Sequence, residues 1–167
     1  MLLGCRRAEI GGLLWSEINF DAATITLPAG RVKNALEHVT PLPTAAAEIL
    51  KAQRRDDRDH VFSDKGPHGF RSWSRGKAAL DARVGISPGW VLHDLRRTFS
   101  TRLNGKLGVA PHVVEHLLNH VSGRSAISRI YNRAIYANEK AAALALWAEH
   151  LAALVEERPA KIVALRA

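Results

Sequence analysis

Residues 23–40 alternate apolar and polar side chains as a β-hairpin does, and this stretch constrains the fold most because the rest of the chain is patterned as helices. Residues 23–27 have the two-residue period of a strand, residues 30–34 supply turn chemistry, and residues 38–40 predict a returning strand that Pro41 closes. The stretch is expected to be a β-hairpin or a small meander, so a small antiparallel sheet near the N-terminus must fit among helices. The predicted fold is α+β, mostly helical, in one domain.

Helical patterning covers most of the remaining sequence. Residues 1–15 carry apolar side chains at helical spacing, and Thr44 is the expected N-cap of the helix that follows the hairpin. A short helix is expected to carry Tyr131, and Arg158 begins a C-terminal tail over 158–167. Longer helices are expected over four further ranges: 72–83, 93–104, 111–118 and the alanine-rich 138–157.

The chain of 167 residues is strongly basic. Its 24 Lys and Arg against 16 Asp and Glu give a formal net charge of +8, which favours a polyanionic partner and most often nucleic acid. The single cysteine, Cys5, excludes an internal disulfide and argues against a cysteine-based zinc site. No stretch approaches the roughly 18 apolar residues of a membrane span, and the start does not have the pattern of a signal peptide. We therefore expect a soluble, cytoplasmic protein.

Four separated segments carry polar side chains that folding alone does not readily explain. Arg6 and Glu9 lie three apart on a predicted helix, where a surface ion pair is the simplest interpretation. Lys33 lies at the hairpin turn, where most lysines are merely solvated. His93 and Arg96 share a helix face at spacing three, and a partly buried pair of this kind needs partners, of which an anionic ligand is one.

The fourth segment is a Leu-x-x-His motif ending at His120, followed eleven residues later by Tyr131. His112, His116 and His120 are spaced four apart, so a metal site is an alternative. Three ligands on consecutive turns of one straight helix converge poorly on one ion, and no other group convincingly completes the set. We expect no metal ion, and no dinucleotide either, because no Gly-x-Gly-x-x-Gly follows a strand.

Taken in order, these segments resemble the tyrosine recombinase (phage integrase) family. The shared pattern is Gly-x-Arg-x-x-Glu, a hairpin lysine, His-x-x-Arg, Leu-x-x-His and then a tyrosine. The segment at 14–18, Leu-Trp-Ser-Glu-Ile, is similar to the Leu-x-Trp-Ser-Asp-Ile that ends the first of these helices in many integrases. The ending, from Tyr131 through Trp147 to Leu151, is similar to prophage-type integrases that insert into tRNA genes. The resemblance spans residues 4–151 and implies the catalytic-domain fold of this family.

The resemblance implies site-specific recombination, in which a tyrosine oxygen attacks a DNA phosphodiester and forms a 3′-phosphotyrosine. The covalent intermediate conserves the bond energy, so no cofactor is expected. Tyr131 matches the nucleophile, and Tyr136 is its competitor. The remaining matches are Arg6 and Arg96 as phosphate ligands, Lys33 as general acid, His93 as proton acceptor, His120 as a hydrogen-bond partner of the phosphate, and Glu9 as support for the first arginine.

The resemblance also implies partners. These are double-stranded DNA, further copies of the chain in a tetramer that the C-terminal helix helps to join, and a directionality factor or a host DNA-bending protein. Contacts to DNA are expected from Arg31, Lys33, Arg97, Arg124 and Arg129.

Family members carry an N-terminal DNA-binding domain and one or two helices ahead of the first arginine, whereas Met1 lies five residues ahead of Arg6. Residues 1–157 are therefore expected to be a catalytic domain that lacks these parts. Two alternatives stay open: a truncated, non-catalytic DNA-binding remnant, and a topoisomerase-like enzyme that relaxes any plasmid.

Overall fold

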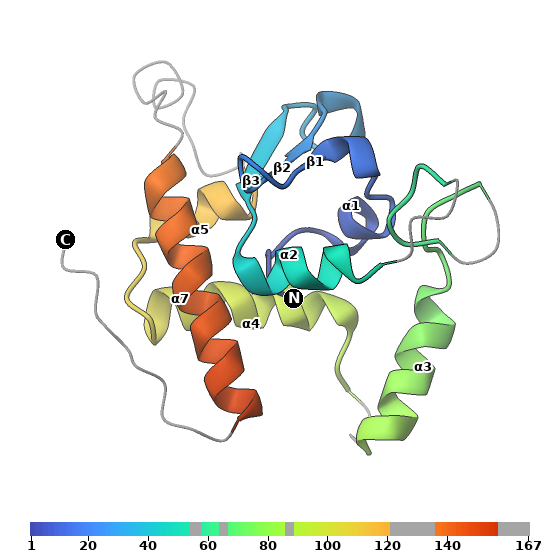
Figure 1. Cartoon of the computed structure of the whole chain (residues 1–167). Coiled ribbons are helices and arrows are strands. Elements are labelled where there is room, and N and C mark those ends of the chain that lie inside the picture. The colour runs from blue at the N-terminus through green and yellow to red at the C-terminus, as the bar shows by residue number, and fades with distance from the viewer. Residues whose placement is uncertain (54–57, 64–66, 86–88, 121–135, 157–167) are drawn as a thin grey trace.

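A three-stranded antiparallel sheet lies beside a group of helices in the computed structural model of the chain (Figure 1). The structure describes residues 1–53, 58–63, 67–85, 89–120 and 136–156. The strands are β1 (Ile18–Asn19), β2 (Thr24–Leu27) and β3 (His38–Pro41), with β2 between the other two. The predicted hairpin is confirmed as β2 and β3, and β1 extends it to a meander.

The sheet turns one face toward the core. Ile25 and Leu27 are fully buried, whereas the threonines that alternate with them, Thr24 and Thr26, are only half-buried. Leu27 pairs with His38 across the β2–β3 ladder, which places His38 on the buried side as well. The two-residue period of the sequence therefore selects the buried face, as it does in half-covered antiparallel sheets.

The helices largely follow the predicted ranges. The bounds in the structure are α1 (Arg7–Gly11), a 3₁₀ turn (Trp15–Glu17), α2 (Thr44–Lys51), α3 (Trp73–Val84), α4 (Leu92–Gly105), α5 (Pro111–Leu117) and α7 (Ala137–Val155). The expectation that Thr44 is an N-cap is wrong. Pro43 occupies that position, since its carbonyl accepts the N–H groups of Ala46 and Ala47 at 2.9 and 3.0 Å. The fixed φ of proline suits the extended backbone found there.

The first helix is much shorter than the predicted 1–15. Gly4 has a left-handed φ of 63°, which keeps the chain out of a helix before Arg7. The helix then ends at Gly11, where an added Cβ would lie 2.4 Å from the Trp73 ring. The backbone then bonds to distant segments, since the Gly11 carbonyl accepts the Phe70 N–H at 2.7 Å and the Leu13 carbonyl accepts the Val61 N–H at 2.8 Å. Tertiary contacts therefore override the apolar periodicity that predicted a longer helix.

The core is one continuous cluster in which α7 packs on α5, α4 and β3 (Figure 1). Phe99 of α4 meets Trp147 of α7 edge to face, with ring centroids 5.3 Å apart, and both side chains are buried. The Trp147 indole N–H donates to the Met1 carbonyl at 3.3 Å. The start of the chain is thus tied to its last described helix.

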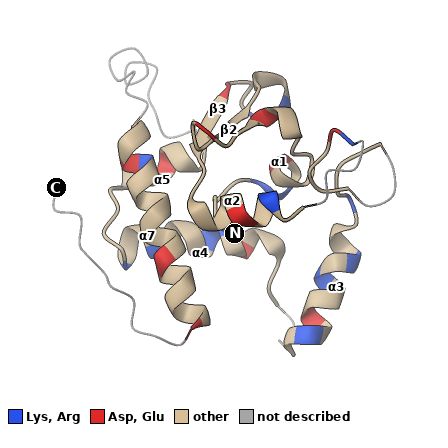
Figure 2. Cartoon of the chain, viewed as in Figure 1, with Lys and Arg blue, Asp and Glu red and all other residues tan. Residues whose placement is uncertain are grey.

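Helix α3 projects from this core and carries basic side chains along its length (Figure 2). None of its residues is buried. Asp81 accepts a hydrogen bond from the Trp90 indole at 2.9 Å and pairs with Lys77 at 2.6 Å, which ties α3 to the segment that leads into α4. The short helix expected around Tyr131 and the expected domain boundary at residue 157 lie outside the described residues.

Candidate active site

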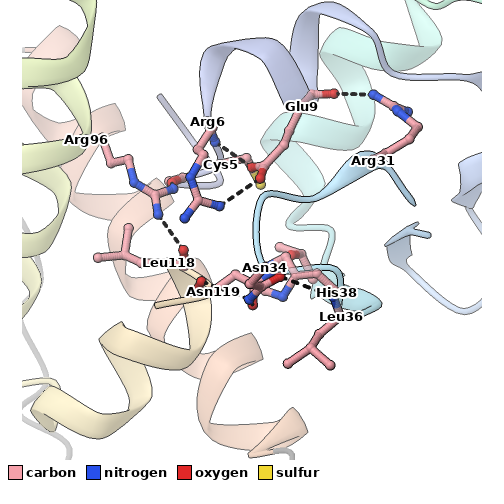
Figure 3. Close-up of polar contacts among 12 residues, drawn as sticks. Cys5, Arg6, Glu9, Arg31, Asn34, Leu36, His38, Arg96, Leu118 and Asn119 are labelled. Carbon is pink, nitrogen blue, oxygen red and sulfur yellow. Dashed lines mark hydrogen bonds and ion pairs between the residues drawn. The ribbon is translucent and has the colours of Figure 1, made fainter. Parts of the chain in front are cut away.

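Arg6 stands at the N-terminus of α1, where Glu9 holds it. The Glu9 carboxylate accepts the Arg6 backbone N–H at 2.7 Å and the Arg6 guanidinium at 2.8 Å. Glu9 is only 5% exposed, and a carboxylate in the first turn of a helix also meets the positive end of the helix dipole. The predicted pair is therefore not a solvated surface ion pair, because Glu9 is buried and fixes the direction of Arg6 (Figure 3).

Arg96 is a buried arginine of α4 that joins two distant parts of the chain. Its guanidinium donates to the carbonyl of Gly4 on one side and to the carbonyl of Leu118 on the other (Figure 3). Burial lowers the pKa of Arg96, and the neighbouring Arg6 cation lowers it further. A guanidinium stays charged despite such a shift, so two cations lie close together here. An anion between them would relieve their repulsion.

Both arginines line one cavity of about 600 Å³, together with His93. His93 lies one helical turn before Arg96 on α4 and is exposed, which differs from the partly buried pair that the sequence predicted. Cys5 and Trp73 contribute to the same lining. The structure thus brings together three of the predicted site residues from α4 and the start of α1.

His120 lies just beyond α5, in a turn that is fixed by hydrogen bonds to other parts of the chain. The helix ends at Leu117 and Asn119 has a left-handed φ of 50°, so His120 leaves the line of the helix. Its Nδ1 atom lies 3.1 Å from the Glu115 carboxylate. Because Leu118 accepts the hydrogen bond from Arg96, the turn that carries His120 is connected directly to the arginine pair.

Lys33 is exposed in the loop between β2 and β3, and it is not among the residues that line the cavity. The next residue, Asn34, binds Asn119: its amide nitrogen donates to the Asn119 side-chain oxygen at 2.6 Å and to the Asn119 carbonyl at 3.3 Å (Figure 3). Neither asparagine was singled out from the sequence. The available signal was position alone, since each is next to a predicted site residue.

Arg31, which the sequence predicted as a DNA contact, has partners within the protein. Its guanidinium pairs with Glu17 and also donates to the Glu9 carbonyl at 2.9 Å. The side chain is 24% exposed, and Glu17 is nearly buried. Arg31 therefore connects the hairpin to α1, next to the carboxylate that holds Arg6. Its contact with DNA stays a prediction.

The other predicted residues are more exposed or lie beyond the described part. Arg97 is 72% exposed and pairs with Asp94 on its own helix at 2.8 Å. Arg124, Arg129 and the predicted nucleophile Tyr131 fall within 121–135, outside the described residues.

Tyr136, just after that range, packs its ring against α5. The ring centroids of His112 and His116 lie 4.9 and 4.7 Å from that of Tyr136. The histidines that the sequence offered as an alternative metal set thus face Tyr136, whereas His120 faces Glu115. Within the described ranges, no group of three or more His, Cys, Asp or Glu side chains is arranged to hold a metal ion.

Two further titratable groups lie at the site: Cys5, half-buried in the cavity lining, and His38, buried on the sheet. Desolvation, followed by the charge of Glu9, raises the pKa of the Cys5 thiol to about 11, so this thiol is protonated at neutral pH. Burial, followed by the charge of Lys140, lowers the pKa of His38 to about 4. Both groups are therefore neutral at pH 7 and leave the charge of the site to the arginines and Glu9.

Comparison with known proteins decides what kind of molecule this is. The sequence model described as the phage integrase family matches residues 1–138. This chain belongs to the phage integrase family. It is 33% identical over 147 residues to Prophage integrase IntA and 34% identical over 151 residues to Prophage integrase IntZ, both of Escherichia coli (strain K12). These matches cover 86% and 89% of this chain, but only 35% and 37% of the relatives, so this chain spans about a third of their length.

Solved structures show the same fold. The integrase from mycobacterium phage Brujita has a TM-score of 0.66 at 23% identity, covering 86% of this chain and 47% of that one. The XerA recombinase has a TM-score of 0.57 at 19% identity, covering 94% of this chain and 54% of that one. The expected tyrosine recombinase fold is therefore confirmed. Across the described ranges of this chain, no helix combines the length and apolarity needed to cross a bilayer.

Proposed function

We propose that this chain forms the catalytic part of an enzyme that recombines DNA at specific sites through a 3′-phosphotyrosine intermediate. The observation that carries the proposal is the cavity at which Arg6, His93 and Arg96 converge. Two guanidinium groups facing one solvent-accessible cavity suit a phosphodiester, because they can bind its two non-bridging oxygens. Membership of the phage integrase family supports DNA as the substrate.

The arginines would stabilise the negative charge that gathers on the phosphate as the new bond forms. Arg96 is held by two backbone carbonyls and Arg6 by Glu9, so both donors are oriented before DNA binds. Donors that are fixed in advance need no reorganisation during the reaction, and the loss of one commonly costs about 3–4 kcal/mol of barrier. In this scheme Glu9 is a positioning residue.

The proton transfers fall to the remaining residues. Tyr131 attacks the phosphorus, and His93 accepts or relays the phenolic proton. The P–O5′ bond breaks as Lys33 delivers a proton to the departing 5′-oxygen. His120, oriented by Glu115, hydrogen-bonds a phosphate oxygen. A second 5′-hydroxyl then attacks the phosphotyrosine and reverses these steps on a new strand, so no external energy source is consumed.

The proposed partners follow from the family. Double-stranded DNA would contact Arg97, Arg124 and Arg129 around the site, together with Lys33 and the exposed part of Arg31. Several copies of the chain would assemble as a tetramer on two DNA sites, with α7 contributing to the contacts between them. A directionality factor or a host DNA-bending protein would decide between insertion and excision, and the resemblance in residues 131–151 points to a tRNA gene as the insertion target.

A covalent-adduct assay tests the proposal. The chain is incubated at low salt with nicked duplexes made from the DNA that flanks its gene, and adducts are resolved on a denaturing gel. We expect an adduct from the unchanged chain and from Tyr136→Phe, and none from Tyr131→Phe, because phenylalanine has no oxygen to attack with.

The reverse pattern would transfer the nucleophile to Tyr136. Absence of any adduct from the unchanged chain would instead favour a non-catalytic remnant. Relaxation of plasmids that lack these flanking sequences would favour a topoisomerase-like enzyme.

A further inference from the structure

The loops that carry Lys33 and His120 are bound to each other by a pair of asparagines. Asn34 donates to both the side-chain oxygen and the carbonyl of Asn119, and the Asn119 amide approaches the Asn34 oxygen at 3.4 Å. The two residues are 85 positions apart in the sequence and both are half-buried. This contact, which we term the Asn34–Asn119 clamp, links the hairpin loop to the end of α5 (Figure 3).

The clamp lies immediately beside Lys33. On the N-terminal side of Lys33, Val32 is 6% exposed and belongs to the core. On the C-terminal side of Lys33, Asn34 is half-buried and hydrogen-bonds to Asn119 at the end of α5, whereas Ala35 and Leu36 are exposed. Asn34 also accepts the Leu36 N–H at 3.3 Å, which shapes the loop from within. The backbone of Lys33 is therefore fixed between a core residue and the clamp.

The other half of the clamp is attached to the phosphate-binding arginines. Asn119 follows Leu118, whose carbonyl accepts the hydrogen bond from Arg96. Its left-handed φ of 50° turns the backbone so that both its carbonyl and its side-chain oxygen meet Asn34. Arg96, the turn at 118–119 and the Lys33 loop thus form one hydrogen-bonded series.

We propose that the Asn34–Asn119 clamp positions Lys33 so that its ammonium reaches the 5′-oxygen that leaves the scissile phosphate. This inference rests on the proposed function, in which Lys33 is the general acid. Lysine is a point charge on a flexible four-carbon stem, so the location of its ammonium depends strongly on where its backbone is held. Holding a catalytic group close to its reacting atom accounts for much of the rate that such a group supplies.

The test uses variants that remove the clamp with little other change. Asn34→Ala removes the donor to both acceptors. Asn119→Gly removes the side-chain acceptor, which makes the shorter of the two contacts, leaves the carbonyl in place and tolerates the left-handed φ. The double variant completes a double-mutant cycle. Lys33→Ala gives the rate of the reaction when the general acid is absent. Asn19→Ala is the matched control, because this exposed turn asparagine caps the Ala22 N–H at 2.8 Å in the β1–β2 turn.

The readout is the rate of adduct formation on two nicked duplexes, one natural and one with sulfur in place of the bridging 5′-oxygen. A thiolate is stable near neutral pH and leaves without a proton, whereas an alkoxide does not, so the sulfur substrate bypasses the general acid. We expect Lys33→Ala to lower the rate of adduct formation about 10²–10⁴-fold on the natural duplex, and we expect that rate to be restored on the sulfur duplex.

For the clamp variants we expect a loss of about tenfold or more on the natural duplex and rates within about twofold of the unchanged chain on the sulfur duplex. The double variant should lose no more than the larger single loss, because the two side chains act as one contact. The control Asn19→Ala should match the unchanged chain on both duplexes.

The failures are distinguishable. If Lys33→Ala recovers on sulfur while the clamp variants either keep full rate on oxygen or stay slow on sulfur, the clamp does not position the acid. The same holds if Asn34→Ala and Asn119→Gly lose rate additively. If the unchanged chain forms no adduct, or Lys33→Ala is not rescued, the proposed function itself is rejected and the role of the clamp with it. Circular dichroism at assay temperature identifies any variant that has unfolded, and the other clamp variant then decides.

Discussion

His38 is a buried histidine on the inner face of β3, and its surroundings favour the neutral imidazole. Its Nε2 atom shares a hydrogen bond of 2.8 Å with the buried Thr40 hydroxyl. Lys140 of α7 lies nearby and donates to the Val39 carbonyl at 2.7 Å. The low accessibility and the neighbouring ammonium both oppose a charge on the imidazole, in that order of importance.

This burial predicts that stability falls in mild acid. The folded protein keeps His38 neutral down to a pKa of about 4, whereas the unfolded chain titrates it at the ordinary value of 6.5. Between these values the unfolded state binds more protons, so the free energy of unfolding decreases as the pH falls from 6.5 to 4. We expect this residue to account for a loss of about 3 kcal/mol across that window.

Urea unfolding at a series of pH values measures the effect. A His38→Gln variant should be less stable at neutral pH but should lack the part of the acid-dependent stability loss that His38 contributes, leaving the part that the buried His150 adds. His68→Gln, at an exposed position, should retain the loss in full. If His38→Gln follows the same pH profile as the unchanged chain, the proton uptake belongs to another group.

At the scale of elements, the approach of α4 to the start of the chain sets the geometry of the arginine pair. The Gly4 carbonyl accepts the hydrogen bond from Arg96, and a Cβ added at Gly4 would lie 2.6 Å from the Phe99 ring. Because Phe99 packs in turn on Trp147, the position of Gly4 is fixed by the core of the protein. Glycine therefore does two things here: it permits the left-handed φ and leaves room for the aromatic ring.

A pair of glycine substitutions separates these two effects. Gly85 has a similar φ of 67° at the C-terminus of α3, but an added Cβ there meets nothing within 4 Å. Gly85→Ala should cost about 1–2 kcal/mol of unfolding free energy from backbone strain alone. Gly4→Ala should cost roughly 1–3 kcal/mol more, because the methyl group overlaps Phe99. Urea denaturation compares the two, and equal losses would show that Phe99 moves aside freely.

For the whole molecule, the net charge of +8 is the property that bears most on the proposed binding of DNA. Helix α3, which projects from the core, carries part of it, with Arg75, Lys77 and Arg83 against Asp81 (Figure 2). The chain covers 35% and 37% of its curated relatives, so it offers only part of the surface that those proteins present. Affinity that depends on phosphate neutralisation falls steeply with salt, and a smaller contact surface gives a shallower dependence.

The salt dependence of DNA binding tests the predicted contact of Arg97. With a short labelled duplex between about 50 and 200 mM salt, each phosphate neutralised adds about −0.9 to the slope of log affinity against log salt. Arg97→Gln should make the slope shallower by about that amount and change stability by less than about 0.5 kcal/mol, since the side chain is 72% exposed. An unchanged slope would remove Arg97 from the DNA interface.

Arg31→Gln provides the contrast, because its guanidinium is engaged with Glu17 and the Glu9 carbonyl. This variant should lose roughly 2 kcal/mol of stability. If Arg31 also contacts DNA as predicted, Arg31→Gln makes the slope of log affinity against log salt shallower as well. The stability and the slope together then assign the role of Arg31.

Much of this protein follows from the sequence alone. The alternation in 23–40 predicted β2 and β3. Glycine and proline signals predicted α3, α4 and α5 nearly to their ends, and the alanine-rich stretch did the same for α7. The order of the Arg6, Lys33, His93–Arg96 and His120 motifs indicated the family that the comparisons confirm. These features depend on periods and spacings of the chain itself, so no knowledge of packing was needed to see them.

Tertiary structure decided how those residues meet. The bond from Arg96 to Gly4 joins positions 92 apart, and that from Asn34 to Asn119 joins positions 85 apart. The early end of α1 and the internal partners of Arg31 have the same origin, since a neighbour brought close by packing outweighs local preference. Local sequence determines which element a side chain belongs to, but its partner is set by which surfaces the core brings into contact. No period in the sequence encodes that choice.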